Sequence, residues 1–364
     1  MLVLVVASII ALIVTFYASR DEIPFGLEFA FLLITFVAAI HYNYGNDYQS
    51  YATIFDVVTR HDFSYEGLIK HTFYKESGWA LLCFIFKPVG FLWMVVFLSI
   101  VQNLIYYSFV RFYVPKEWWL LGVFIYLTSK SLYILNMSMM RQGLAIALFL
   151  LAWPFIQKKK PLGIAVATLI IFVATTIHSS ALILYPFVFW GYIPMKNGRI
   201  NGIILLILFV ILFSSVDFLN SILIQFAEIE DLQEYFKMFE NRATSKFGLG
   251  FILLTIPFVI SVVFLIFNKN ATTEEKQFVT IASLGSLIIP FVQIISMLAR
   301  VGYYFAPFTI VSVPITYRWL PNPLKKIFVS LFVFIMIFDY WNFFHSDIFT
   351  AAYLTFHSVF EVIF

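Results

Sequence analysis

The sequence predicts an all-α integral membrane protein with about 12 transmembrane helices, within a range of roughly 11–14. Of the 364 residues, 62% are hydrophobic and only 12% are charged, whereas a typical soluble domain has roughly 25% charged residues. A soluble globule must cover itself with a surface that faces water, and this composition provides too little polar surface for that. Apolar runs long enough to cross a bilayer also recur along the whole chain.

The apolar runs predict one polytopic domain over residues 1–364, without a soluble module. The first run is followed at once by another, so we expect an uncleaved anchor and not a signal peptide. The predicted spans lie at 1–18, 27–42, 91–110, 118–135, 141–157, 162–178, 181–195, 200–216, 248–267, 277–298, 301–317 and 327–343. Residues 76–90 suit a re-entrant or interfacial helix, and residues 348–364 either a surface helix or one further span.

Basic residues predict the orientation. The strongest marker of the cytoplasmic side is Lys158-Lys159-Lys160, and alternation of the spans then places the other short basic loops on the same side. The outer side receives the loops 43–90 and 217–247, which hold most of the acidic residues. Residues 217–247 have the spacing of an amphipathic helix, which either covers a cavity or serves as an interfacial connector.

Four ionisable residues stand at the outer ends of predicted spans. Arg141 and Arg300 each begin a span, His178 ends one, and Asp47 follows the second span. A charged side chain near the membrane interior costs a few kcal/mol or more, so it tends to be kept where it meets a partner or a substrate. These residues are therefore the candidates for a site on the outer face.

Arg141 and Arg300 together predict an anion site. Each lies at a predicted helix N-terminus, where free N–H groups favour an anion, and a guanidinium binds phosphate oxygens with two parallel bonds. The alternative is that each arginine is an interfacial anchor whose head reaches the lipid headgroups. We favour a pyrophosphate clamp because the two arginines share one face with His178.

His178 is a candidate proton acceptor near neutral pH. The alternative, a histidine that bonds the free carbonyls at the end of its helix, is at least as well supported by the sequence. We expect no metal and no cofactor. No second histidine lies at the spacing of a zinc site, and Cys83 is the single cysteine.

Residues 42–51 interleave aromatic rings with amides and one carboxylate. Proteins bind sugars with such a mixture, because rings cover the C–H faces while polar groups bind the hydroxyls. The alternative is an ordinary interfacial tyrosine belt with an Asx turn. The residues expected to bind glycan are Tyr44, Asn46, Tyr48 and Tyr51.

Four short patches, in this order, resemble the EpsG-like, Wzy-type polysaccharide polymerases of bacteria, which assemble O-antigen, exopolysaccharide or capsule repeat units. The patches and the helix layout cover nearly the whole chain. They are Gly45-Asn46-Asp47-Tyr48 with Tyr51, Met140-Arg141-Gln142 with Ala145, His178-Ser179-Ser180-Ala181, and Arg300 with Tyr303-Tyr304-Phe305.

This resemblance implies a metal-independent glycosyltransferase with a GT-C-like multi-span architecture in the bacterial cytoplasmic (inner) membrane. The growing glycan would move from polyprenyl (undecaprenyl) diphosphate onto the next lipid-linked oligosaccharide at the outer face. Arg141 and Arg300 would bind the diphosphate with support from Gln142 and Tyr304, and His178 or Asp47 would accept the proton. The expected partners are these lipid-linked oligosaccharides and membrane lipids, with a chain-length regulator and a flippase as further candidates. No nucleic-acid partner is expected.

Other functions remain open on the sequence. A transporter or flippase for a lipid-linked glycan would also need a polar cavity and arginines, but transporters commonly show internal repeats, and none is evident here. A ligase that attaches finished glycan to another acceptor would use the same chemistry. A membrane O-acyltransferase is the least supported, because nothing identifies a route for an acyl donor.

Overall fold

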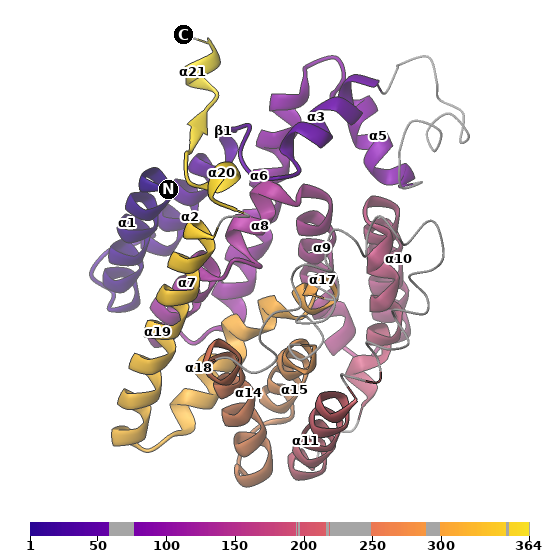
Figure 1. Ribbon diagram of the computed structural model, residues 1–364. Coiled ribbons are helices and arrows are strands. Elements are labelled where there is room, and N and C mark those ends of the chain that lie inside the picture. The colour runs from indigo at the N-terminus through magenta and orange to yellow at the C-terminus, as the bar shows by residue number, and fades with distance from the viewer. Residues whose placement is uncertain are drawn as a thin grey trace. The chain divides into compact units, whose positions relative to one another are not determined.

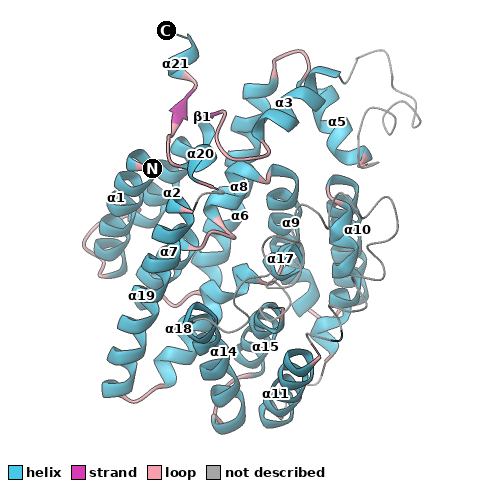
Figure 2. Ribbon diagram, viewed as in Figure 1, coloured by secondary structure: helices cyan, strands magenta, loops and turns pink. Residues whose placement is uncertain are grey.

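The computed structural model describes residues 1–57, 76–193, 195, 197–215, 218, 249–288, 299–346 and 349–363. Most of this part of the chain is helical (Figure 2). Four of them are long and apolar enough to cross a membrane, namely α1 (Leu2–Ser19), α6 (Phe91–Tyr113), α9 (Met140–Gln157) and α19 (Asn322–His345), and shorter apolar helices accompany them. The prediction of an all-α, multi-pass membrane protein is thus confirmed, whereas the number of about 12 spans stays a prediction.

The chain divides into two compact units. The first comprises Met1–Ile193 and Met336–Phe364, and the second Pro194–Ile335, so α19 contributes residues to both. Besides parts already named, the first unit holds α2 (Gly26–Ala39), β1 (His41–Tyr42), α3 (Tyr48–Val57), α5 (Ser77–Phe86), η1 (Lys116–Trp118), α7 (Trp119–Thr128), α8 (Tyr133–Ser138), α10 (Pro161–Ile177), η2 (Ser179–Tyr192), α20 (Thr350–Tyr353), β2 (His357–Ser358) and α21 (Phe360–Ile363). The second holds α11 (Gly198–Ser214), α14 (Leu249–Phe267), α15 (Thr273–Leu287), α17 (Ala299–Tyr303), η4 (Ala306–Phe308) and α18 (Thr309–Trp319).

Helix α9 is the central helix of the first unit. It packs against α10, α6, η2 and α8, and most of its residues are buried. Helices α9 and α10 run side by side in Figure 1 and are joined by the short tri-lysine segment Lys158–Lys160. Because the pair is antiparallel, the start of α9 and the end of α10 lie together at the end opposite the lysines.

A buried polar network holds the start of α9 in place. The Tyr126 hydroxyl donates to Asn103 Oδ1 at 2.9 Å and accepts from Asn136 Nδ2 at 3.3 Å. Gln102 donates to the carbonyl of Met140, the first residue of α9, at 3.3 Å. Each of these polar groups would be costly to bury without a partner, so the network fixes α6, α7, α8 and α9 relative to one another.

Two predicted spans have a different local structure. The span 118–135 is interrupted after α7, because Lys130 forms an ion pair with Asp339 at 3.0 Å and its serine neighbours bond to each other. The span 181–195 is the 3₁₀ helix η2, which contains Pro186. At about 2 Å per residue, its 14 residues still extend about 28 Å, close to the thickness of the hydrocarbon core.

The prediction that Arg300 begins a spanning helix is wrong. Arg300 lies in α17, a helix of five residues, and α18 begins only at Thr309. Pro307 lies between them, within η4, and a proline lacks the N–H that a continuous helix would need at that point. The argument that a long helix N-terminus supports Arg300 in binding an anion therefore does not apply.

The peripheral segments form short elements. Helix α5 has ten residues and spans about 15 Å, too little to cross a bilayer. Residues 349–363 form neither one surface helix nor one span, because they contain α20, β2 and α21, and β2 pairs antiparallel with β1. The predicted amphipathic segment 217–247 lies, except for residue 218, outside the described residues, as do residues 58–75 of the outer loop and residues 289–298.

The second unit is built on α14, α15 and α18, with α11 packed against α14 and α15. Helix α15 begins with a capping box, in which the Thr272 hydroxyl accepts from the Glu275 N–H and the Glu275 carboxylate accepts from the Thr272 N–H. Glu275 also pairs with Arg318 of α18. The start of α15 is thus tied to the end of α18.

Replacing Asn103 with Leu should lower the free energy of unfolding by about 1–3 kcal/mol, because the buried Tyr126 hydroxyl loses its acceptor. Unfolding of the purified protein in mixed micelles, followed by circular dichroism, measures this change. Leu104→Val is the matched control, since Leu104 is the next residue on α6 and is 59% exposed. Equal destabilisation by both substitutions would contradict the role given to the network.

Candidate functional site

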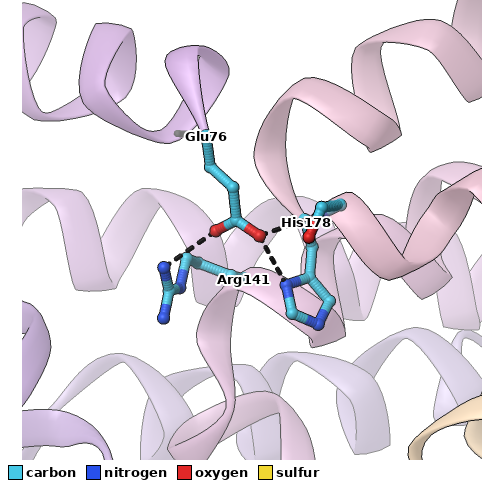
Figure 3. A network of polar contacts seen from close by, with 4 residues as sticks. Glu76, Arg141 and His178 are labelled. Atoms are coloured by element: carbon cyan, nitrogen blue, oxygen red, sulfur yellow. Dashed lines mark hydrogen bonds and ion pairs between the residues drawn. The ribbon is translucent and has the colours of Figure 1, made fainter. Parts of the chain in front are cut away.

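The carboxylate of Glu76 joins three elements of the first unit at one point (Figure 3). Its Oε2 lies 2.8 Å from Nη1 of Arg141, and its Oε1 lies 2.9 Å from Nδ1 of His178. The backbone N–H of Ser179 also donates to Oε1, at 2.8 Å. The Glu76 side chain is only 2% exposed, so a buried carboxylate connects the start of α9 with the junction of α10 and η2.

Helix α5 positions Glu76 next to Arg141 and His178. Glu76 is the residue before the first turn of α5, but its side chain does not cap its own helix. It reaches the neighbouring elements because α5 packs closely on α10. A Cβ atom at Gly78 would lie 2.3 Å from Oγ1 of Thr176 and 3.0 Å from its backbone carbon. Glycine is therefore required at this position for α5 to lie where it does.

Arg141 is the second residue of α9 and is held from two sides. Its side chain is 11% exposed, and the guanidinium carbon lies 5.0 Å from the centre of the Tyr51 ring, a cation–π contact. An anchor that reaches the lipid headgroups would be exposed and unpaired with a buried acid. The burial and the ion pair of Arg141 do not fit that alternative.

His178 ends α10 in an extended conformation. Its backbone N–H bonds the Ala174 carbonyl, whereas its side chain bonds Glu76 and not a carbonyl of the helix end. Ser179 begins η2, and its N–H is one of the groups that a helix start leaves without an internal partner. Glu76 accepts that N–H and the imidazole with the same oxygen.

The surroundings of Glu76 favour its charged form. Burial by itself raises the pKa of this carboxyl, but the hydrogen bond to His178, the charge of Arg141 and the Ser179 N–H more than offset it. The pKa of Glu76 is consequently below its ordinary value, and the carboxylate is ionised at neutral pH. The network therefore contains at least one full negative and one full positive charge.

The predicted glycan-binding residues have different environments. The rings of Tyr44, Tyr48 and Tyr51 are buried; Tyr48 and Tyr51 lie in a core cluster that also contains Trp79. Asn46 is exposed. The backbone turns at Gly45 with φ of +91°, where a Cβ would lie 2.5 Å from Ser138. Their role in binding sugar stays a prediction.

The remaining predicted residues lie in both units. Asp47 is partly buried and precedes α3, whose Tyr51 N–H bonds the Asp47 carbonyl. Gln142 is buried beside Arg141. Arg300 is partly buried and Tyr304 fully buried in the second unit. The clamp that joins Arg141 with Arg300 stays a prediction.

Sequence reasoning missed Glu76. Its signal is the same as that of Arg141 and His178, an ionisable residue directly at the end of an apolar segment, but α5 is too short to be taken as a span. Lys130, a further cation within a predicted span, is paired with Asp339. Within the described ranges, no three His, Cys, Asp or Glu side chains gather closely enough to hold a metal ion.

The fold and this network define a multi-pass membrane protein with a buried, charged site at one end of its helices. The chain matches the model of the EpsG family over residues 27–357 and belongs to that family. This confirms the resemblance drawn from the four patches and supports a role as a polysaccharide polymerase. No curated protein and no solved structure matches the chain.

The lowered pKa of Glu76 predicts a dependence of stability on pH. A carboxyl whose pKa is lower in the folded than in the unfolded protein stabilises the fold above its unfolded value, and that contribution is lost as the pH falls through the folded pKa. The stability advantage of the wild type over Glu76→Gln should therefore be present above about the ordinary value of 4.5 and shrink as the pH falls below it. Thermal unfolding in detergent on both sides of this value measures it, and an advantage that persists undiminished below it would contradict the assignment.

Proposed function

We propose that this protein polymerises polyprenyl-diphosphate-linked oligosaccharide repeat units at the outer face of the bacterial cytoplasmic membrane. The growing glycan leaves its lipid diphosphate and is joined to the incoming lipid-linked unit. One observation supports this most strongly: Arg141 and His178, a candidate anion-binding group and a candidate base, share the carboxylate of Glu76. They lie at the end of α9 and α10 that is opposite the tri-lysine segment. Because lysines favour the cytoplasmic side, the proposal puts Arg141 and His178 on the outer side.

The reaction needs positive charge at the leaving group. The bond between the anomeric carbon and the diphosphate oxygen breaks, and the diphosphate keeps the electron pair. Arg141 stabilises this charge, because a guanidinium has five N–H donors and can serve Glu76 and a phosphate oxygen together. In the proposal Arg300 binds the same diphosphate, with Gln142 and Tyr304 in support.

The reaction also needs an acceptor for the hydroxyl proton. We favour His178 over Asp47, because the imidazole lies next to the same carboxylate as Arg141, and an imidazole nitrogen with a free lone pair can accept a proton. Residues 42–51 supply polar groups to the sugars, and among the four residues expected to bind glycan (Tyr44, Asn46, Tyr48 and Tyr51) Asn46 is the exposed one. The lipid-linked units are the substrates, and a flippase and a chain-length regulator are the proposed partners.

Replacing Arg141 or Arg300 with Ala should lower polymer formation by about 100-fold or more, the usual loss when a group that stabilises developing charge is removed. The assay is extension of a lipid-linked oligosaccharide by purified protein without an energy source, which a transporter would not carry out. Lys130→Ala is the matched control, since Lys130 is a partly exposed cation paired with Asp339. Arg141→Lys retains the positive charge beside Glu76. It therefore tests whether the loss of activity in Arg141→Ala arises from loss of folding. Normal chain lengths in both alanine variants would contradict the clamp.

His178→Gln and Asp47→Asn should separate the two candidate bases. Loss of the base should lower the rate of transfer at saturating substrate by about 100-fold or more, with binding of the lipid-linked donor retained. We expect this result for His178→Gln and near-normal transfer for Asp47→Asn. The opposite pattern would assign the proton to Asp47. An acceptor-swap assay with finished glycan and a second acceptor distinguishes a polymerase from a ligase.

A further inference from the structure

Glu76 determines which ring nitrogen of His178 carries the proton. Its Oε2 faces the donor Nη1 of Arg141, and its Oε1 accepts the Ser179 N–H. Because Glu76 is ionised, neither oxygen carries a proton to donate, so Oε1 must also accept from His178 across the 2.9 Å to Nδ1. A neutral imidazole that donates from Nδ1 keeps its lone pair on Nε2.

The Nε2 atom of His178 is placed to receive a proton. It is shielded from solvent and has no hydrogen-bond partner among the residues that the structure describes. In Figure 3 it points away from Glu76, on the far side of the ring. A buried nitrogen with a lone pair and no partner is costly, and a substrate hydroxyl that donates to it would remove this cost.

We infer that Glu76 is the positioning residue of the transfer reaction. It holds His178 in the Nδ1–H form, so that Nε2 can accept a proton, and it fixes Arg141 beside it with its other oxygen. The inference rests on the proposed function, because it needs a hydroxyl that loses a proton during the reaction. It adds a residue to that function, since no patch of the family resemblance contains Glu76.

The proton and the charges balance in this arrangement. The acceptor hydroxyl oxygen forms a bond to the anomeric carbon, the diphosphate leaves with its electron pair, and the hydroxyl proton moves to Nε2 of His178. The ring becomes an imidazolium that still donates from Nδ1 to Glu76. Without the carboxylate between them, the imidazolium and the Arg141 guanidinium would repel each other.

The first test measures the tautomer without substrate. ¹⁵N NMR of the histidine-labelled protein in lipid bilayers distinguishes the two ring nitrogens, and the His178→Gln variant assigns the signal among the six histidines. We expect the Nδ1–H form in the wild type and in Glu28→Gln, a matched change at a carboxylate bonded to Tyr107. In Glu76→Gln the charged Arg141 donor should take the amide oxygen, which leaves the NH₂ to face Nδ1, so the ring proton should move to Nε2. An unchanged His178 signal in Glu76→Gln would overturn the inference.

The second test measures rates per folded molecule, with folding verified by gel filtration in detergent. Glu76→Gln should lower kcat by about 100-fold or more and change KM only a few-fold, because the ring carries its proton on the wrong nitrogen. Glu76→Asp should recover part of kcat, since a carboxylate returns at a shorter reach. A purely structural role would lower the yield of folded protein and leave kcat near that of the wild type, which would overturn the inference.

The two tests also separate this inference from the proposed function. If the wild type does not extend any lipid-linked oligosaccharide, the proposed function fails, and with it any catalytic role for Glu76. The NMR result then still decides whether Glu76 sets the tautomer. If the wild type is active and Glu76→Gln is equally active, the proposed function stands and the positioning role of Glu76 fails.

Discussion

The first unit depends on one buried negative charge. An ionised carboxylate is expensive to remove from water, and it persists in an apolar setting only when opposite charge and hydrogen bonds surround it. Glu76 obtains these from Arg141, His178 and the Ser179 N–H. Since the donors belong to different elements, any shift of α5, α9 or the start of η2 would leave part of that cost uncompensated. The interaction thus selects one arrangement of these elements.

Two features away from Glu76 make this arrangement possible. Gly78 allows α5 to approach α10 closely enough for the carboxylate to reach the imidazole. The amide network around Tyr126 holds the first turn of α9, which carries Arg141. Close packing and buried hydrogen bonds therefore act together, and the site is built mainly on helices and not on long loops. Such support keeps functional groups within the small tolerances that chemistry requires.

Much of this fold is visible in the sequence, because long apolar runs with polar ends give strong signals. Helices α9 and α10 begin and end within one residue of the predicted spans 141–157 and 162–178. Where the observed helices differ from the predicted spans, the causes are local. They are a polar Ser-Lys-Ser triplet after α7 and prolines in η2 and η4. The position of Glu76 at the end of an apolar segment is visible in the sequence, but its pairing is not, since its partners are 65 and 102 residues away in the chain.

The burial of the ion pair at Arg141 has a consequence for the conditions under which the protein works. Dissolved ions weaken attraction between charges in water but affect charges enclosed by protein far less. A surface pair such as Lys116 and Asp21, whose side chains are 38% and 82% exposed, weakens at high salt, whereas the buried pair persists. On the proposed outer face, the surrounding fluid has a salinity that the cell does not control. A site assembled from sheltered charges would keep its shape in dilute and salty media alike.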